Sequence, residues 1–571
     1  MDPQELINII GQLRLPLRIT KLITNIAGER TVNFYRNGKK ITSRKIKKGA
    51  AQGRVSSPIA FNTYISDIDN HIGQKCTVGM YADDAGLYTV ANNEQECTYN
   101  LEDGLRHLQP WLEKIKLKIS KTKTKFMILS RKKRLQGNTT IRIDNAIINR
   151  SDTARFLGVT LDTKMKWKPF INEVKRNITR SVDIMKTLAR KAWGAHPTTL
   201  LQVYKGLTRA RADWACFCTQ SACQTLKKEI ERGQNAALRV VLGCFPSTPA
   251  VVLRDLANQP TAEIRGKILT SRFLARTFTS KSHPLNQKLK EANHLWERKQ
   301  MTKTGVSFLH KIWREEEPDI TNLSRSDKLP CFEIPLKPQL ELTTQNFDIG
   351  KRIKKKESNA EDFTSEIAKN RPNWTIIYTD ASKTKDDKYI GFAFTCSNPK
   401  MEKKFKISSN FSIAEGEALA ILQSLKTVKN MNINKLLICT DSASTLEALN
   451  HIGLSGKTSP IILEIKSLIS RLKMAGRKTE LWWCPSHLGI EGNEKADELA
   501  NEARLTGELL ELKPNYTIYS RTIQIKYKTE DETIRHEDFK KSGSTYHKFN
   551  NPQPNNSKKA WFENKNLKES P

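Results

Sequence analysis

The strongest constraint on the fold of this chain is the alternation of strand-like and helix-like segments between Trp374 and Arg504. Three strand-like runs come first, and helix, strand, helix, strand and helix follow them. That order is typical of an α/β domain, in which helices cover the faces of a sheet. Apolar residues make up 38% of the whole chain, which is enough for ordinary hydrophobic cores in this domain and in others.

Four acidic residues of this segment stand at the ends of regular elements or within them, where a fold can direct them to one point. Asp380 ends the run WTIIYTD, Glu417 opens EALAILQSL, Asp441 ends KLLICTD, and Asp497 lies in NEKADELANEA. Crowded carboxylates repel one another unless a cation lies among them. Mg²⁺ and Mn²⁺ prefer oxygen ligands, and two such ions about 4 Å apart promote phosphodiester hydrolysis. A single acid would more often be a cap or a surface charge, so the prediction depends on the whole set.

The motifs TDAS, SIAEGEALAI, CTDSAS and WWCPSHLGIEGNEKADELA occur in the order and spacing of the type 1 ribonuclease H family, which this segment resembles. The resemblance implies an α/β fold with a mixed five-stranded sheet at residues 372–506. It also implies an endoribonuclease that cuts the RNA strand of RNA–DNA hybrids with two Mg²⁺ or Mn²⁺ ions. The four acids would hold the ions, and His487 would assist proton transfer or product release.

Glu415 competes with Glu417 for the second acidic position of this family. The family pattern places Ala and Ile three and four residues after the acid, and Ser-Ile five and four residues before it. Glu417 satisfies both conditions, whereas Glu415 satisfies neither fully. Gly416 replaces the usual Ala before the acid. The pattern therefore favours Glu417.

The N-terminal part contains a second acidic motif, Asp83-Asp84, within TVGMYADDAGLY. Apolar residues on both sides predict a hairpin with the two acids at its turn. LINIIGQLRLPLRITKLITNI predicts helices that a charged connector follows, and GAAQGRVSSPIAFNTYISDI predicts a loop before a helix. LKISKTKTKFMILS and RFLGVTLD read as short strands, and residues 166–279 as a series of amphipathic helices.

This order of motifs resembles the palm of reverse transcriptases from non-LTR retrotransposons. By position, the resemblance implies three roles. Asp83 and Asp84 would bind metal, Gln52 and Gly53 would contact the nucleotide and template, and Phe156, Leu157 and Gly158 would grip the primer. An additional metal-binding Asp of that family is absent, and Asp2 lies too close to the first helix to replace it. Ala51 and Arg54 also stand where Pro and Ser are usual, so we expect no DNA synthesis by this chain alone.

The predicted organisation is multidomain, with an α/β palm fragment, an all-α thumb-like region and an α/β ribonuclease H fold. Five segments are expected: a partial palm without motif A and the fingers at 1–165, a helical thumb-like region at 166–279, a connection at 280–371, the ribonuclease H domain at 372–506, and a polar, disordered tail at 507–571.

The charge balance of the chain indicates an anionic partner. There are 96 Lys and Arg against 60 Asp and Glu, a formal charge of +36, and most of the excess precedes residue 372. The expected partners are an RNA–DNA hybrid and retrotransposon RNA, with no membrane and no small-molecule cofactor. The scattered cysteines and the absence of a long apolar run favour a soluble protein of the nucleus or cytoplasm. The basic runs SRKIKK and KRIKKK fit either nuclear import or a phosphate-binding surface.

Two alternatives to the nuclease remain open at this point. One is a functional RNA-directed DNA polymerase, if the missing part of the palm is supplied by another chain. The other is a decayed, catalytically silent protein that only binds nucleic acid.

Overall fold

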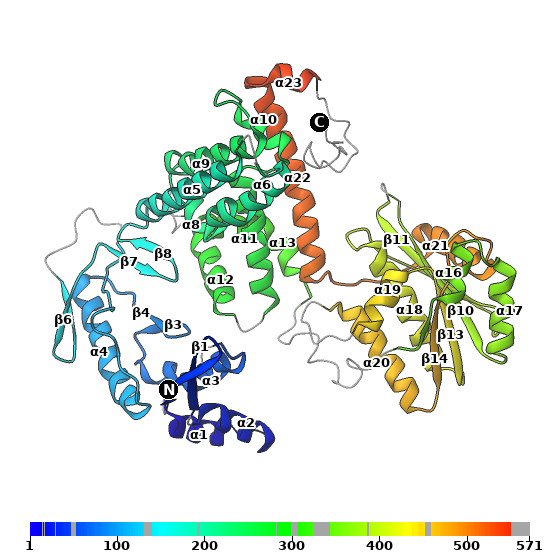
Figure 1. Ribbon diagram of the computed structural model, residues 1–571, viewed down its shortest axis with the longest axis horizontal. Coiled ribbons are helices and arrows are strands. Elements are labelled where there is room, and N and C mark those ends of the chain that lie inside the picture. The colour runs from blue at the N-terminus through cyan, green and yellow to red at the C-terminus, as the bar shows by residue number, and fades with distance from the viewer. Residues whose placement is uncertain are drawn as a thin grey trace. The chain divides into compact units, whose positions relative to one another are not determined.

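A computed structural model describes residues 1–571 except 14, 16, 29, 47–48, 50–52, 131–138, 191–193, 281–282, 299–305, 325–342, 385–386, 452–457 and 550–571. The chain forms two compact units, residues 1–246 and 247–571. Figure 1 shows the elements of both units along the chain. None of the described helices is long and apolar enough to cross a membrane.

The first half of the N-terminal unit consists of helices and four separate two-stranded hairpins. The helices are α1 (Pro3–Gln12), α2 (Leu17–Ala27), α3 (Ser56–Tyr64), η1 (Ile68–His71) and α4 (Glu94–Lys114). The hairpins are β1 (Arg30–Arg36) with β2 (Lys39–Ile46), β3 (Thr77–Tyr81) with β4 (Asp84–Tyr88), β5 (Thr140–Ile143) with β6 (Ala146–Asn149), and β7 (Thr153–Phe156) with β8 (Val159–Asp162). Their core contains Leu6 and Ile10 of α1, Tyr64 of α3 and Trp111 of α4.

Two sequence-based expectations for this half are wrong. The charged stretch after α2 is not a connector but the hairpin β1–β2, whose Asn37-Gly38 turn has two positive φ angles, as tight hairpin turns require. LKISKTKTKFMILS forms no strand, and in the described part of the chain its ladder pairing is limited to an isolated bridge between Phe126 and Arg150. Alternating side chains alone do not make a strand.

Helices make up the rest of the N-terminal unit, as the periodicity predicts. They are α5 (Lys168–Leu188), α6 (Pro197–Val203), a π-helical turn (Tyr204–Arg209), α7 (Ala210–Asp213), α8 (Cys216–Thr219) and α9 (Gln224–Leu242). Gly233 of α9 lies so close to Ile178 of α5 that a Cβ there would come within 2.8 Å of its side chain. The two long helices therefore pack directly against each other.

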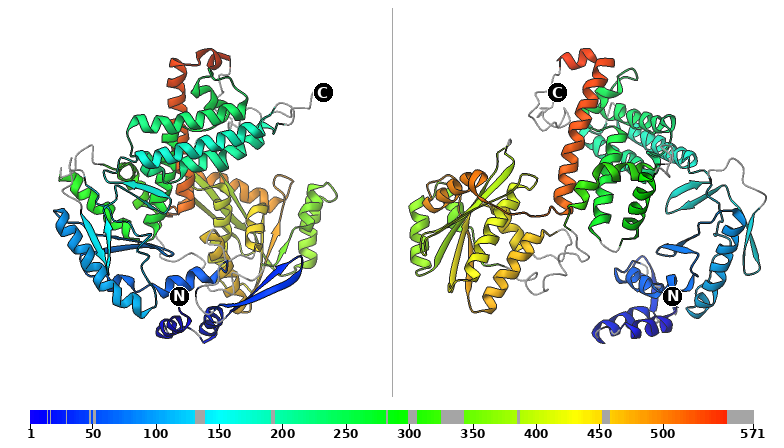
Figure 2. Two further views of the ribbon diagram at one scale, coloured as in Figure 1. Left: turned by 60° about the vertical axis from the view of Figure 1, so that its left-hand side comes forward. Right: turned by 180° about the vertical axis from the view of Figure 1, so that it is seen from behind.

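The C-terminal unit begins with a helical layer that includes part of the segment expected to be a disordered tail. The helices are α10 (Ala250–Leu256), α11 (Ala262–Thr279), α12 (Pro284–Glu297), α13 (Phe308–Thr321), α22 (Tyr516–Lys541) and α23 (Ser544–Phe549). Figures 1 and 2 show α22 beside the earlier helices, and Glu316 of α13 accepts hydrogen bonds from Tyr519, Tyr527 and Lys526 of α22.

The expectation of disorder is therefore wrong for residues 516–549, and the sequence shows why it arose. Besides Ile518, the buried side chains of α22 recur every four residues, at Tyr519, Ile523, Tyr527, Asp531, Arg535 and Phe539. Two of these, Asp531 and Arg535, are charged. Arg535 pairs with Asp255 and Asp531 inside the layer, so these charges are buried with partners. A search for apolar periodicity misses a stripe of this kind.

The rest of this unit is built around a mixed sheet of seven strands rather than the expected five. Its order is β15-β12-β11-β10-β13-β14-β9. The strands are β9 (Gln345–Asn346), β10 (Thr375–Ser382), β11 (Tyr389–Cys396), β12 (Met401–Ser408), β13 (Lys435–Thr440), β14 (Lys478–Trp483) and β15 (Glu508–Leu509). The five long strands match the predicted ones. The two extra strands are two-residue edge strands, too short to leave a periodic signal.

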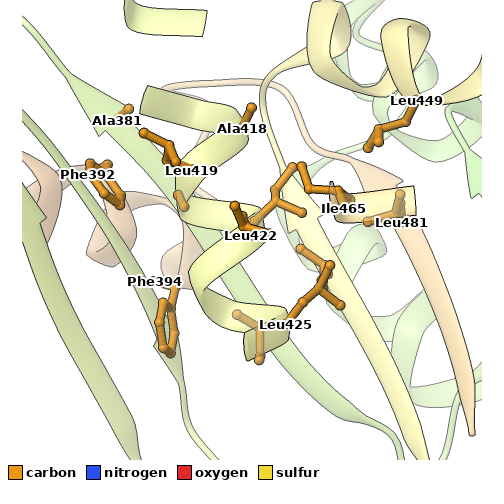
Figure 3. Close-up of a cluster of buried hydrophobic side chains, with 14 of the residues drawn as sticks. Ala381, Phe392, Phe394, Ala418, Leu419, Leu422, Leu425, Leu449, Ile465 and Leu481 are labelled. Carbon is orange, nitrogen blue, oxygen red and sulfur yellow. The ribbon is translucent and has the colours of Figure 1, made fainter. Parts of the chain in front are cut away.

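Helices cover both faces of this sheet. They are α16 (Asp348–Lys354), α17 (Ala360–Asn370), α18 (Ile413–Lys429), α19 (Ala443–Asn450), α20 (Pro460–Met474) and α21 (Glu491–Thr506). On one face, α18 packs its leucines against β10 and β11, as Figure 3 shows for Leu419, Leu422 and Leu425. On the other face, α21 packs on Ala393 of β11, and α16 and α17 cover β13 and β14.

Candidate active site

Two of the predicted acids reach the same end of the sheet because their strands are parallel neighbours. Thr379 of β10 pairs with Thr440 of β13. Asp380 and Asp441 each follow that pair by one residue. Glu417 comes from α18 and Asp497 from α21, helices that contact β10 from its two faces. Four separate elements thus bring the four carboxylates together.

The pKa of Asp380 reflects this convergence. Its side chain is buried, with 7% of the residue exposed. Burial, together with the negative charges of Asp441, Asp497 and Glu417, raises the pKa of Asp380 to about 8, while the backbone N–H of Ala381 opposes the shift. That N–H donates to Asp380 Oδ1 over 2.6 Å. A carboxyl with a pKa raised in this way ionises readily only when a positive charge lies beside it.

Asp441 and Glu417 are also shifted by burial, which raises the pKa of both. The Ser442 hydroxyl donates to Glu417 Oε2, and the Ser486 hydroxyl donates to Asp441 Oδ2 over 2.7 Å. These bonds lower the two pKa values only partly. Asp441 Oδ1 is buried and has no hydrogen-bond partner among the described residues. Buried acceptors seldom lack a partner, so this oxygen is available for another ligand.

Glu415, the competing acid, has a different position. Its carboxylate closes a capping box at the start of α18, accepting from the backbone N–H and the hydroxyl of Ser412 over 2.7 and 2.8 Å. Arg521 of α22 donates to the same oxygen over 3.4 Å. Glu415 is thus occupied in holding the helix terminus, whereas Glu417, half a turn later, adjoins Asp380 and Asp441.

His487 lies in the turn between β14 and α21, with a positive φ of 53°. Its side chain is 80% exposed, and its Nδ1 lies 3.9 Å from Asp497 Oδ2. The other oxygen of Asp497 accepts from Asn501 over 3.0 Å, and Asn501 in turn accepts from the Ser382 hydroxyl over 2.6 Å. The acid is therefore tied to the end of β10, while the imidazole remains open to solvent.

The sequence-based prediction missed the polar residues that hold these carboxylates. They are Ser382, Ser442, Ser486 and Asn501. Ser442 and Ser486 lie within the recognised motifs, directly beside Asp441 and His487. Asn501 follows Asp497 by four residues on one helix, a spacing that places the two on the same face and was available from the sequence.

The acidic site fits a divalent cation by the chemistry of its oxygens. Three of its four carboxylates have a raised pKa, and one oxygen, Asp441 Oδ1, lacks a partner among the described residues. Within that part of the chain, no three His, Cys, Asp or Glu side chains already converge at metal-binding distance.

The second acidic motif forms the expected hairpin, but its acids are exposed. Tyr81 pairs with Asp84 across a turn of Ala82 and Asp83, and both aspartates are solvent-accessible. Gly53 has a φ of +83°, which favours glycine, and no atom of the described residues lies within 4 Å of where a Cβ would stand. Gln52 and Ala51 lie outside the described residues. Asp2 caps α1 and pairs with Lys116 over 3.2 Å, so it has a structural role.

The predicted primer-grip residues form the turn between β7 and β8. Leu157 and Gly158 both have positive φ, and Phe156 packs beside Gly86 of β4, 3.4 Å from where a Cβ would stand. Trp214 lies equally close to Gly158. The structure therefore places this turn beside the hairpin that carries Asp83 and Asp84.

Comparison with known families assigns two segments of the chain. The family described as "Reverse transcriptase (RNA-dependent DNA polymerase)" matches residues 2–161, and the family "RNase H" matches residues 372–504. A crystal structure of RNase H1 from Halobacterium salinarum matches 23% of this chain and 97% of its own, at 18% identity and a TM-score of 0.19.

Three similar proteins come from retrotransposable elements of insects. A putative 115 kDa protein of the type-1 element R1DM from Drosophila melanogaster is 22% identical over 40% of this chain and 22% of its own length. A Pol polyprotein of the type-1 element R1 2 from Nasonia vitripennis is 24% identical over 34% of this chain and 48% of its own. The RNA-directed DNA polymerase of the Drosophila mobile element jockey is 22% identical over 33% of this chain and 20% of its own. The chain therefore spans less than half the length of each relative.

Proposed function

We propose a ribonuclease H function for this chain, which is related to non-LTR retrotransposon polyproteins and carries a reverse transcriptase segment before an RNase H segment. Residues 372–506 would hydrolyse the RNA strand of RNA–DNA hybrids. The observation that carries the proposal is the convergence of four carboxylates from separate elements at one end of the sheet, where Asp441, Asp497 and Glu417 act on the buried Asp380. Holding several ionised carboxylates close together is unfavourable unless cations bind between them. Divalent cations at such a site promote the hydrolysis of phosphodiesters.

Asp380, Glu417, Asp441 and Asp497 would hold two Mg²⁺ or Mn²⁺ ions in this proposal. Bound ions supply the positive charge that activates the attacking water and stabilises the leaving 3′ oxygen. Ser442 and Ser486 would orient Glu417 and Asp441 through their hydroxyl hydrogen bonds. The unpartnered Oδ1 of Asp441 supports a role as a direct ligand.

His487 would assist by moving a proton near the leaving group. Its exposed ring, 3.9 Å from Asp497, can reach solvent and the edge of the acidic site at once. The segment would recognise hybrid shape and 2′-hydroxyls rather than base sequence, because the attacked phosphate adjoins a ribose.

The direct test is hydrolysis of a labelled RNA–DNA hybrid by the purified full chain in Mg²⁺. Asp441→Asn is expected to lower the rate on the order of 10²–10³-fold, as removal of one transition-state-stabilising group typically does. Glu417→Gln should have a comparable effect. Equal rates for the wild type and both variants would contradict the nuclease proposal and leave only binding.

Glu415→Gln is the matched control, because it changes the same residue type two positions away. It removes one charge from the capping box without touching Asp380, Asp441 or Ser442. We expect at most a few-fold change in hydrolysis. An inactive Glu415→Gln beside a nearly wild-type Glu417→Gln would reverse the assignment of the second acid.

A second candidate activity, RNA-directed DNA synthesis, is favoured by the reverse transcriptase match over residues 2–161. Asp83 and Asp84 are its candidate metal ligands, and both are exposed at the turn between β3 and β4. Extension of a labelled DNA primer on an RNA template would test it. Extension that Asp83→Asn and Asp84→Asn abolish would establish the polymerase.

A further inference from the structure

Hairpin β1–β2 has no buried face. Every residue of the hairpin after Arg30 is exposed, including Phe34 at 48%, Tyr35 at 63% and Ile41 at 63%. Figure 2 shows the two strands as a narrow ribbon that extends from the N-terminal helices. A two-stranded hairpin without a covered face is marginally stable in water, so apolar and aromatic side chains there indicate a binding surface.

The charges of the hairpin select the kind of partner. Residues 30–46 contain six Lys or Arg and no Asp or Glu. Four of these cations, all exposed, surround the turn and the adjoining strand: Arg36, Lys39, Lys40 and Arg44. A surface of this sign attracts phosphate and repels a basic protein or a second copy of this ribbon.

The two aromatic rings are placed beside cations on both faces of the ribbon. Phe34 and Val32 share one face by the alternation of a strand, and Arg44 is paired with Val32. Tyr35 belongs to the opposite face and is paired with Lys40. A register shift between Phe34 and Tyr35 interrupts the ladder at this point. Each face thus offers a ring for stacking and a cation for phosphate.

We propose that hairpin β1–β2 binds single-stranded nucleic acid, with bases stacked on Phe34 and Tyr35 and phosphates held by Arg36, Lys39, Lys40 and Arg44. The rings favour a single strand, because only unpaired bases have free faces for stacking. The hairpin lies outside residues 372–506, so this binding does not depend on the proposed nuclease.

The test compares two quadruple variants of the full chain. In one, Arg36, Lys39, Lys40 and Arg44 are changed to Gln. In the control, the exposed Lys400, Lys403, Lys429 and Lys435 are changed to Gln, which removes the same charge elsewhere. Affinity for a labelled 20-nucleotide oligo(U) RNA is measured by fluorescence anisotropy in EDTA between 50 and 300 mM salt.

The hairpin variant should reduce the slope of log affinity against log salt by about 3, because each phosphate contact on a single strand contributes about 0.7. The control variant should leave the slope close to that of the wild type. Equal reductions in both variants would overturn the proposal and attribute binding to net charge alone.

Stacking is tested separately with Phe34→Ala and Tyr35→Ala, each expected to weaken oligo(U) binding about tenfold. Phe34→Trp and Tyr35→Trp retain a ring and should bind as the wild type does, which guards against misfolding. Tyr99→Ala and Phe245→Ala remove exposed rings elsewhere and should change little. If the alanine variants lost as much affinity for a 20-base-pair duplex as for oligo(U), the assignment to a single strand would be wrong.

Discussion

The two acidic motifs of this chain differ in what surrounds their carboxylates. Asp83 and Asp84 are neighbours in sequence on one exposed turn between two short strands. Asp380 is buried beside carboxylates from three other elements, and its pKa is raised to about 8. Two acids that are adjacent in sequence need only a turn to lie side by side. Carboxylates from four different elements lie close together only when a packed domain holds those elements in place.

A third acid shows that burial alone does not define a site. Glu316 is fully buried, but both of its oxygens accept hydrogen bonds, from Tyr527 over 2.6 Å, Lys526 over 2.9 Å and Tyr519 over 3.2 Å. Asp441 is only partly buried, but its Oδ1 is buried and has no hydrogen-bond partner among the described residues. The difference separates an acid that closes a structural network from one that has capacity for a ligand.

The largest expected effect tests the contrast between the two motifs. Asp380→Asn should lower hybrid hydrolysis on the order of 10²–10³-fold, since it removes a central negative charge from the proposed cation site. The double variant Asp83→Asn with Asp84→Asn should hydrolyse hybrid at the wild-type rate. Steady-state rates on a short hybrid measure both, and a slow double variant would contradict the independence of the two motifs.

The next largest effect concerns stability rather than hydrolysis. Glu316→Ala leaves the hydroxyls of Tyr519 and Tyr527 buried without their acceptor, which should destabilise the α13–α22 packing by about 3 kcal/mol. Urea unfolding followed by tryptophan fluorescence reports on Trp313, which is buried on α13. Asp319→Ala on the same helix is the control, because its side chain is exposed. Similar unfolding midpoints for the two variants would show that the network contributes little.

A smaller effect appears in the pH dependence of the cation-free protein. Because the pKa of Asp380 is about 8 when folded and about 4 when unfolded, the folded state holds the extra proton between these values. Stability should therefore fall as the pH rises from 4 toward 8. Glu417 and Asp441 act in the same direction.

Asp380→Asn should flatten this decline and raise the melting temperature at pH 8 by a few degrees in EDTA. Added Mg²⁺ should stabilise the wild type at pH 8 and have less effect on the variant. Differential scanning fluorimetry from pH 5 to 8.5 is sufficient. A wild-type stability that rises through this range would contradict the raised pKa.

The smallest predicted effect concerns the contact between α22 and α18. Arg521→Ala removes the 3.4 Å bond to Glu415, and a partly exposed ion pair contributes about 0–1 kcal/mol. We expect hydrolysis to change no more than about twofold. A much larger loss, with unchanged melting temperature, would mean that α22 positions Glu417 through the first turn of α18.

The sequence predicts an element well when the pattern that specifies it lies within a short stretch of neighbouring residues. The five long strands, the helix that carries Glu417 and the hairpin at Asp83 follow from periodicity and turn residues. Three features did not: the two edge strands, the β1–β2 hairpin and α22. The edge strands are too short to show a periodic pattern, the Asn37-Gly38 turn stands among charged residues, and the buried stripe of α22 includes the charged Asp531 and Arg535.

By itself, the sequence determined the order of elements and the types of residue at their ends, because local periodicity and motif spacing are properties of neighbouring residues. It identified Asp380, Glu417, Asp441, Asp497 and His487 as one candidate site. Only the tertiary structure decided that Glu415 caps α18 while Glu417 adjoins Ser442, and that Asp441 Oδ1 is left without a partner in the described chain. Those outcomes depend on which groups from distant segments meet, and the free energy of burying a charge is set by that meeting.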